Sequence, residues 1–150
     1  MFVRADRIVS GFADLRPFLA SRLPAAESEL ITFPVVERIA SIALLKRYEQ
    51  LQDIVGQLGR IVLSWELEDI SRLTRRDFAN KLERLGVVDD ADDYMASNEL
   101  RNRLVHEYPL DEGEQVHRVN ASWEGFPRLV AMIDALRRHM VDREFDFDGQ

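Results

Sequence analysis

The sequence predicts an all-α fold, and three observations support this prediction. Apolar residues recur every three or four positions along most of the chain, as they do on one face of a helix. Almost no segment alternates apolar and polar residues in the way of a half-buried strand. The composition, with 46% hydrophobic and 31% charged residues, is that of an ordinary globular protein. At 150 residues one hydrophobic core is expected, so residues 1–150 are predicted to form a single domain.

Two helices are expected in the first part of the chain. The first covers roughly 3–22, and Pro17 should kink or split it. The second, roughly 33–65, is the longest, with Thr32 as its predicted N-cap and Pro34 in its first turn. One apolar stripe along this second helix is expected to be the spine of the core: Val36, Ala40, Leu44, Tyr48, Leu51, Val55, Leu58, Val62 and Trp65.

Two glycines, Gly56 and Gly59, interrupt this stripe. Each costs about 1 kcal/mol relative to Ala inside a helix. Close approach of another helix would offset that cost, and otherwise the glycines are simply weak points of the helix.

Shorter helices are expected after a connection over 65–73. Thr74, followed by Asp77, is the predicted N-cap of a helix that ends at Gly86. Asp89 and Asp90 then cap a helix over roughly 91–108.

The last part of the chain is also predicted to be helical. Pro109 ends the preceding helix, because its ring disfavours helical geometry at Tyr108. From Asp111 onward we expect two helices, or one kinked helix, with the interruption at Gly125 and Pro127. The acidic tail, 144–150, is expected to be frayed.

Charge and composition exclude several classes of function. A net charge of −7 argues against a surface that holds nucleic acid over its whole extent, so any RNA contact must be local. The chain has no cysteine, which excludes disulfides, thiolate metal sites and a thiol nucleophile. No apolar run approaches the ~20 residues of a membrane span. We therefore expect a cytoplasmic protein that does not enter the membrane.

One of the three histidines, His106, lies in a dense group of polar residues. Asn102 is four positions before it, so both side chains should project from the same face of a helix. Arg101 lies about 100° behind Asn102, and its long side chain reaches the same small volume. Imidazole, guanidinium and amide groups are thus predicted to converge on one phosphate.

Such a group of residues suits cleavage of RNA by its own 2′-hydroxyl. An imidazole accepts or donates the proton and a guanidinium stabilises the charge that grows on phosphorus, so no metal ion or other cofactor is needed. The reaction needs both a base and an acid, and His106 supplies one of them. Two copies across a two-fold axis would supply both, which predicts a homodimer with the 91–108 helix in its interface. A solvated surface helix with a chance pairing of His and Arg remains the simpler interpretation.

One short run of the chain consists of Arg101, Asn102, three further residues, His106, one residue and Tyr108. This run resembles the Arg-x4-His-x-Tyr signature of HepT-like toxins in the HEPN superfamily. Segments 78–88, 94–108 and 126–129 are similar to the corresponding segments of such proteins, and the similarity covers roughly 33–140. The helical extension over 1–31 and the connection over 65–73 depart from the family pattern, so nothing is transferred to them.

The resemblance implies an up-and-down helical bundle that dimerises with its two motifs at the subunit cleft. It further implies a metal-independent endoribonuclease that acts as the toxin of a type II toxin-antitoxin system. Arg101 and His106 would then be catalytic, with Asn102 as a supporting polar group. The implied partner is a minimal nucleotidyltransferase antitoxin, which neutralises the toxin by AMP transfer to Tyr108 or by complex formation.

Two other interpretations of the motif remain open. In the first, the chain is a non-catalytic HEPN bundle that binds a nucleotidyltransferase or a nucleotide through Arg101 and His106. In the second, it is a helical adaptor with a purely structural role. For Tyr108, the alternative to modification is simple packing against the next helix.

Overall fold

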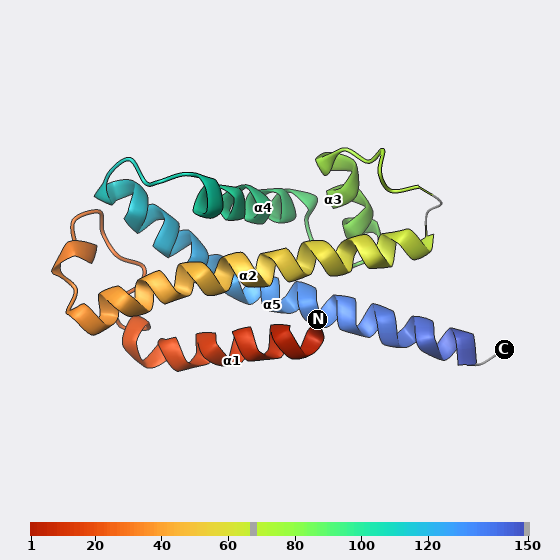
Figure 1. The fold of residues 1–150 in the computed structure, drawn as a ribbon, viewed down its shortest axis with the longest axis horizontal. Coiled ribbons are helices and arrows are strands. Elements are labelled where there is room, and N and C mark those ends of the chain that lie inside the picture. The colour runs from red at the N-terminus through yellow and green to blue at the C-terminus, as the bar shows by residue number, and fades with distance from the viewer. Residues whose placement is uncertain (67–68, 149–150) are drawn as a thin grey trace.

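Two long helices, α2 (Val35–Glu66) and α5 (Glu112–Asp148), run side by side along the molecule (Figure 1). The computed structural model describes residues 1–66 and 69–148, with side chains up to residue 143. Helix α1 packs against α2, and α4 packs against α2 and α3. Residues 1–66 and 69–148 contain no strand, which confirms the all-α prediction. The remaining elements are α1 (Phe2–Leu19), a 3-10 turn (Leu30–Thr32), α3 (Arg75–Arg84) and α4 (Ala91–His106).

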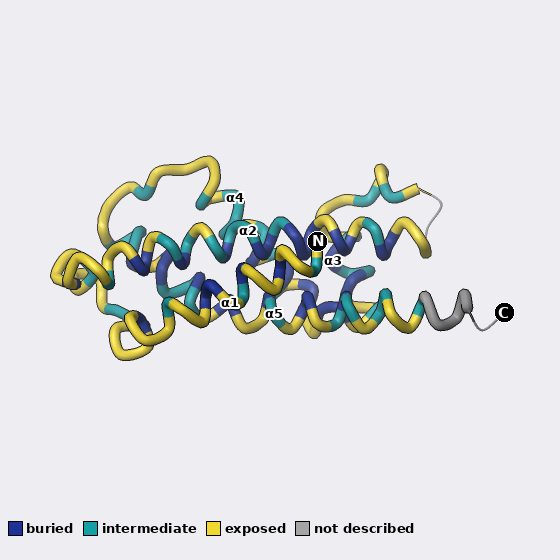
Figure 2. Tube along the Cα trace, turned by 60° about the horizontal axis from the view of Figure 1, so that its bottom comes forward, coloured by how far each residue is buried: buried dark blue, intermediate teal, exposed yellow. Residues whose placement is uncertain are grey.

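The apolar stripe of α2 forms the centre of the core, as predicted. Its members from Ala40 to Val62 are buried, whereas Val36 and Trp65 at the two ends are exposed. Figure 2 shows this burial on the inner faces of α2 and α5. Gly59 lies where Phe78 of α3 approaches, since a Cβ added there would be 3.0 Å from the Phe78 ring. The close helix approach predicted for this glycine is therefore confirmed.

The start of α2 differs from the prediction. Thr32 is not its N-cap; it ends the 3-10 turn, where its hydroxyl donates to the Glu29 carbonyl oxygen at 2.6 Å. Phe33 is extended and buried, and the first bond of α2 runs from the Arg38 amide to the Pro34 carbonyl oxygen. Burial of Phe33 thus moves the helix start from the predicted residue 33 to Val35.

The structure contradicts both predictions that a helix is split at a proline. Helix α1 continues through Pro17, and α5 continues through Gly125 and Pro127. Both prolines are exposed, and of the residues four positions earlier, whose carbonyls lose an amide partner, Ala13 is exposed and Trp123 is half-buried. Phe126, fully buried beside Pro127, and the flanking apolar residues keep α5 in one piece.

Helix α5 is also longer than predicted at its C-terminus. It runs to Asp148, so the tail expected to fray is helical through that residue, and Gly149 and Gln150 lie outside the described residues. In the described part of the chain, no helix combines the length and apolar character that crossing a membrane requires.

Local capping signals are confirmed in the middle of the chain. Thr74 and Asp77 form a reciprocal capping box at the start of α3, and Gly86 leaves that helix with a φ of 74°. Asp90 caps α4 by accepting the Asp92 amide. Helix α4 ends at His106, two residues before the predicted end, because Glu107 is already extended. Tyr108 therefore lies beyond the helix.

Candidate functional site

Arg101 lies half-buried on α4 and pairs with Asp53 of α2. Its Nε is 2.6 Å from Asp53 Oδ1, and its Nη1 donates to Asn102 Oδ1 at 3.3 Å. These three residues line a hollow of about 620 Å³ between α2, α3 and α4, which we call the Arg101 hollow. The Asp53 carboxylate thus neutralises much of the positive charge that Arg101 would otherwise present.

His106, the last residue of α4, is exposed and lines a different hollow. This second hollow, of about 410 Å³, contains Tyr108, Ile42 and Lys46, and we call it the His106 hollow. Arg101 and His106 are five residues apart, which on a helix places them about 140° apart around its axis. The structure brings Arg101 and Asn102 together but does not place His106 with them in one hollow of the same chain.

A buried arginine of α5, Arg118, holds the end of α4 in place. Its Nη1 donates to the carbonyl oxygens of Glu107 at 2.7 Å and Arg103 at 3.4 Å, and its Nη2 donates to Glu114 Oε1 at 2.8 Å. Carbonyls at the end of a helix lack partners within the helix. The Arg103 carbonyl also accepts the Glu107 amide at 3.0 Å, so the donor from Arg118 matters most at the Glu107 carbonyl, where it fixes the backbone beside His106.

The loop that carries Tyr108 is fixed from its other side as well. Glu114 Oε2 accepts the Leu110 amide at 2.6 Å, and Asp111 Oδ1 accepts the Glu114 amide at 2.9 Å. The Leu110 amide, and then the Arg118 guanidinium, lower the pKa of Glu114 below its ordinary 4.5. A carboxylate that accepts hydrogen bonds is stabilised in its charged form. The loop 107–111 is therefore attached to α5 at both ends.

Tyr108 itself projects fully into solvent. It is 96% exposed, so the alternative in which it packs against the next helix is wrong. Tyr48 and Tyr94 are 2% and 5% exposed, which leaves Tyr108 as the accessible tyrosine among the described residues.

An exposed apolar face leads into the His106 hollow. Val35, Ile39 and Ile42 are spaced four and three residues apart on α2 and are each more than half exposed. Ile42 then lines the His106 hollow together with Val105 and Tyr108. We call this set the α2 apolar face: Val35, Ile39, Ile42, Val105 and Tyr108. An exposed apolar face of this kind commonly marks an interaction surface.

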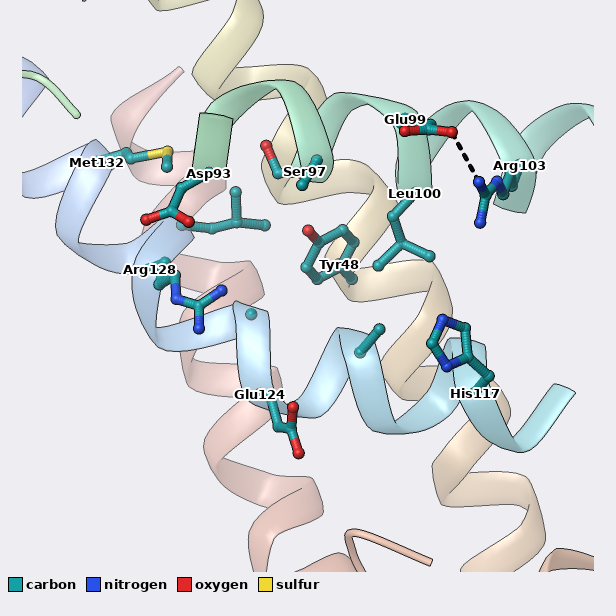
Figure 3. A pocket seen from close by; sticks show the side chains of 14 residues that line it. Tyr48, Asp93, Ser97, Glu99, Leu100, Arg103, His117, Glu124, Arg128 and Met132 are labelled. Carbon is teal, nitrogen blue, oxygen red and sulfur yellow. Dashed lines mark hydrogen bonds and ion pairs between the residues drawn. The ribbon is translucent and has the colours of Figure 1, made fainter. Parts of the chain in front are cut away.

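A third hollow, of about 270 Å³, lies between α2, α4 and α5 (Figure 3). Tyr48 is at its centre, and burial raises the pKa of that hydroxyl while Arg128 acts in the opposite direction. Asp93, Glu124 and His117 also line this hollow, so its charge is mixed. It shares no residue with the predicted site.

Among the side chains of residues 1–66 and 69–143, no three from His, Asp or Glu are grouped as metal ligands would be. No family model matches the chain, and neither a curated protein nor a solved structure matches it. The resemblance to HepT-like toxins therefore stands on the quoted residues alone.

Sequence reasoning missed Asp53 and Arg118. Asp53 lies on the long helix beside its apolar stripe, and nothing in its neighbourhood marks it as the partner of a residue on α4. Arg118 follows Glu114 by four positions, the spacing of a helical ion pair, which was an available signal for α5. Its contact with Glu107 is tertiary and has no counterpart in the sequence.

Proposed function

We propose that the chain is a metal-independent endoribonuclease, the toxin of a type II toxin-antitoxin system, in which Arg101 and His106 are catalytic and Asn102 supports them. The observation that carries this proposal is the placement of His106. Its imidazole is exposed at the end of α4, beside a loop that Arg118 holds in place, on the rim of a hollow. An exposed imidazole on a backbone that is held in place suits proton transfer to and from a large substrate.

The proposed reaction is transesterification by the RNA itself. One imidazole accepts the proton of a 2′-hydroxyl, whose oxygen forms a bond to the adjacent phosphorus as the bond from phosphorus to the 5′-oxygen breaks. A second imidazole donates the proton that the departing 5′-oxygen takes up. Arg101 would stabilise the negative charge that builds on the phosphate oxygens in between.

A homodimer is part of this proposal, because one chain supplies one suitable imidazole. The α2 apolar face adjoins His106, so a second copy seated there would cover exposed apolar side chains and bring a second His106 close. The separation of Arg101 and His106 into two hollows of one chain supports this arrangement, since groups from both copies would then complete the site.

The proposal also includes neutralisation of the toxin by a nucleotidyltransferase antitoxin. Tyr108 lies two residues from His106, and its hydroxyl is open to a partner's active site. An AMP group there would add bulk and a negative charge beside the position of the scissile phosphate.

The test is cleavage of RNA by the purified chain in the presence of EDTA. We expect cleavage to continue, and His106→Ala and Arg101→Ala each to reduce it at least ~100-fold while the helical circular dichroism is unchanged. His117→Ala is the matched control, since His117 is exposed but lies outside the motif. Loss of cleavage with EDTA, or cleavage at the parental rate by His106→Ala, would contradict the assignment.

A second candidate is a non-catalytic bundle that binds a nucleotidyltransferase or a nucleotide. The observation that favours this candidate is the ion pair between Arg101 and Asp53, which engages the guanidinium in a hollow that does not include His106. Expression of the chain alone in a bacterium separates the two candidates. A ribonuclease arrests growth in a manner that depends on His106, whereas a binding module leaves growth unchanged.

A further inference from the structure

The Arg101 hollow differs in charge from the other two described hollows. Among the described residues that line it, the charged ones are three arginines and one aspartate: Arg60, Arg75, Arg101 and Asp53. In the His106 hollow the acidic and basic residues balance, and Arg118 already has hydrogen-bond partners. In a chain with a net charge of −7, an anionic ligand would be drawn to the Arg101 hollow.

Amide side chains cover the inner part of this hollow. Gln52 of α2 is 2% exposed, and its Nε2 is 3.5 Å from Asn98 Oδ1 on α4. That distance is the long limit of a hydrogen bond, and the Gln52 amide also has the Tyr94 hydroxyl as a partner, so each amide retains part of its hydrogen-bonding capacity for a ligand. Gln57 and Asn102 add two more amides to the lining. An amide offers a donor and an acceptor side by side, as the edge of a nucleobase does.

An aromatic wall stands beside these amides. The rings of Phe78 and Tyr94 lie with centroids 5.6 Å apart and tilted by 46°. Gly59 allows Phe78 its close approach to α2, and Gly56 lies under the Tyr94 hydroxyl. Burial raises the pKa of Tyr94, which keeps its hydroxyl protonated, and that hydroxyl is a partner of the Gln52 side chain.

We infer that the Arg101 hollow binds one unpaired nucleotide of single-stranded RNA. Its base would lie against Phe78 and Tyr94, with its edge on Gln52 and Asn98, and its phosphates would lie at the exposed arginines Arg60 and Arg75. The volume of about 620 Å³ is in the range of small-ligand sites. Base pairing would hide the edge that the amides read, so the nucleotide must be unpaired. The inference rests on the proposed function in taking this nucleotide to be part of the RNA substrate.

The binding test uses nucleoside 5′-monophosphates and nuclear magnetic resonance of the side-chain amides. We expect a saturable shift of the Gln52 and Asn98 resonances, a weaker shift of the same resonances with the nucleoside alone, and no shift with ribose 5-phosphate. No saturable shift at up to about 10 mM nucleotide, or an equal shift with ribose 5-phosphate, would overturn the inference.

Two double variants with the same charge change test the arginines. Arg60→Gln with Arg75→Gln should weaken nucleotide binding at least about tenfold. Arg38→Gln with Arg84→Gln, on the same two helices but outside the hollow, should leave it within about twofold. Equal losses in both pairs would show a non-specific charge effect and overturn the inference. Gln57→Leu, at an exposed position of the lining, provides an independent test and should weaken binding of the nucleoside.

RNA cleavage by the same proteins separates this inference from the proposed function. Nucleotide binding in the hollow without RNA cleavage would keep the site and contradict the nuclease. RNA cleavage by the parental chain without saturable nucleotide binding would keep the nuclease and overturn the site.

Discussion

Arg118 Nη1 donates to the carbonyl oxygen of Glu107 at 2.7 Å, and so fixes the residue that follows His106 in the chain. The arginine is 3% exposed, and the same side chain also pairs with Glu114. Arg101 and His106 belong to α4, yet the backbone at the end of that helix is held by a residue of α5. Changes on α5 should therefore alter the site without touching the motif.

Replacing Arg118 tests this control directly. Arg118→Met keeps the aliphatic stem but leaves the Glu107 carbonyl without its donor, so we expect the free energy of unfolding to fall by about 2–4 kcal/mol. Hydrogen exchange at residues 107–111 should accelerate more than in the core of α2. Arg138→Met, at an exposed position of the same helix, is the control and should change the free energy by less than about 0.5 kcal/mol. Similar losses in both variants would contradict the role of Arg118.

The pH dependence of the loop should follow Glu114. Its pKa is lowered in the folded protein, so the bond to the Leu110 amide is fully present above the ordinary value of 4.5 and is lost as the pH falls through the lower folded value. We expect the Leu110 amide resonance to titrate below pH 4.5. In Glu114→Gln this titration should be absent, and a Leu110 titration that persisted in that variant would have another cause.

The sequence predicted the fold where the determining signals are local. The Thr74–Asp77 capping box and the Gly86 terminus depend on neighbours within four residues, and both are confirmed. The start of α2 and the continuity of α5 depend instead on which side chains the core buries, such as Phe33 and Phe126. At Thr32 and Pro127 this packing outweighs the local signals for a helix start and a helix break.

In the candidate site, too, the local features were predictable and the tertiary contacts were not. Helical spacing correctly placed Arg101, Asn102 and His106 on one helix, and Asn102 lies beside Arg101 as expected. The direction of the Arg101 side chain is decided by Asp53, a partner 48 positions earlier in the chain on another helix. Spacing along α4 carries no information about that contact, and within one chain Arg101 and His106 line different hollows.

Removing the charge of Asp53 should free Arg101 for phosphate. In a His106→Ala background, which keeps RNA intact under the proposed function, we expect Asp53→Asn to raise RNA affinity about 3- to 10-fold, because a carboxylate 2.6 Å from the guanidinium opposes phosphate binding. Filter binding measures the change. Asp134→Asn, an exposed carboxylate on α5, controls for net charge and should have less than about a twofold effect. An unchanged or lower affinity in Asp53→Asn would contradict the prediction.

The α2 apolar face should be the dimer interface. Ile42 is 62% exposed, so Ile42→Glu should not disturb the core, but a charge in a covered apolar interface should weaken dimerisation at least about 100-fold. Light scattering checks this at several concentrations. Val3→Glu, at a similarly exposed apolar position on α1, should leave the dimer intact. A parental chain that stays near 17.4 kDa at all concentrations would contradict the dimer itself.

Under the proposed function, Tyr108 should be the residue that a nucleotidyltransferase antitoxin modifies. After co-expression with a minimal nucleotidyltransferase from the adjacent reading frame, we expect mass spectrometry to find AMP on Tyr108 and on no other tyrosine. The reason is access: Tyr108 is 96% exposed on a loop held by Arg118 and Glu114, whereas Tyr48 and Tyr94 lie in the core and serve as internal controls.

Tyr108→Phe distinguishes modification from simple complex formation. The variant keeps the ring but has no oxygen to accept AMP, so RNA cleavage should persist in the presence of the nucleotidyltransferase if neutralisation is covalent. The loop geometry should be unchanged, because no described contact of that loop uses the Tyr108 hydroxyl. A toxin that is neutralised without added mass, and equally well as Tyr108→Phe, would show that the partner inhibits by covering His106.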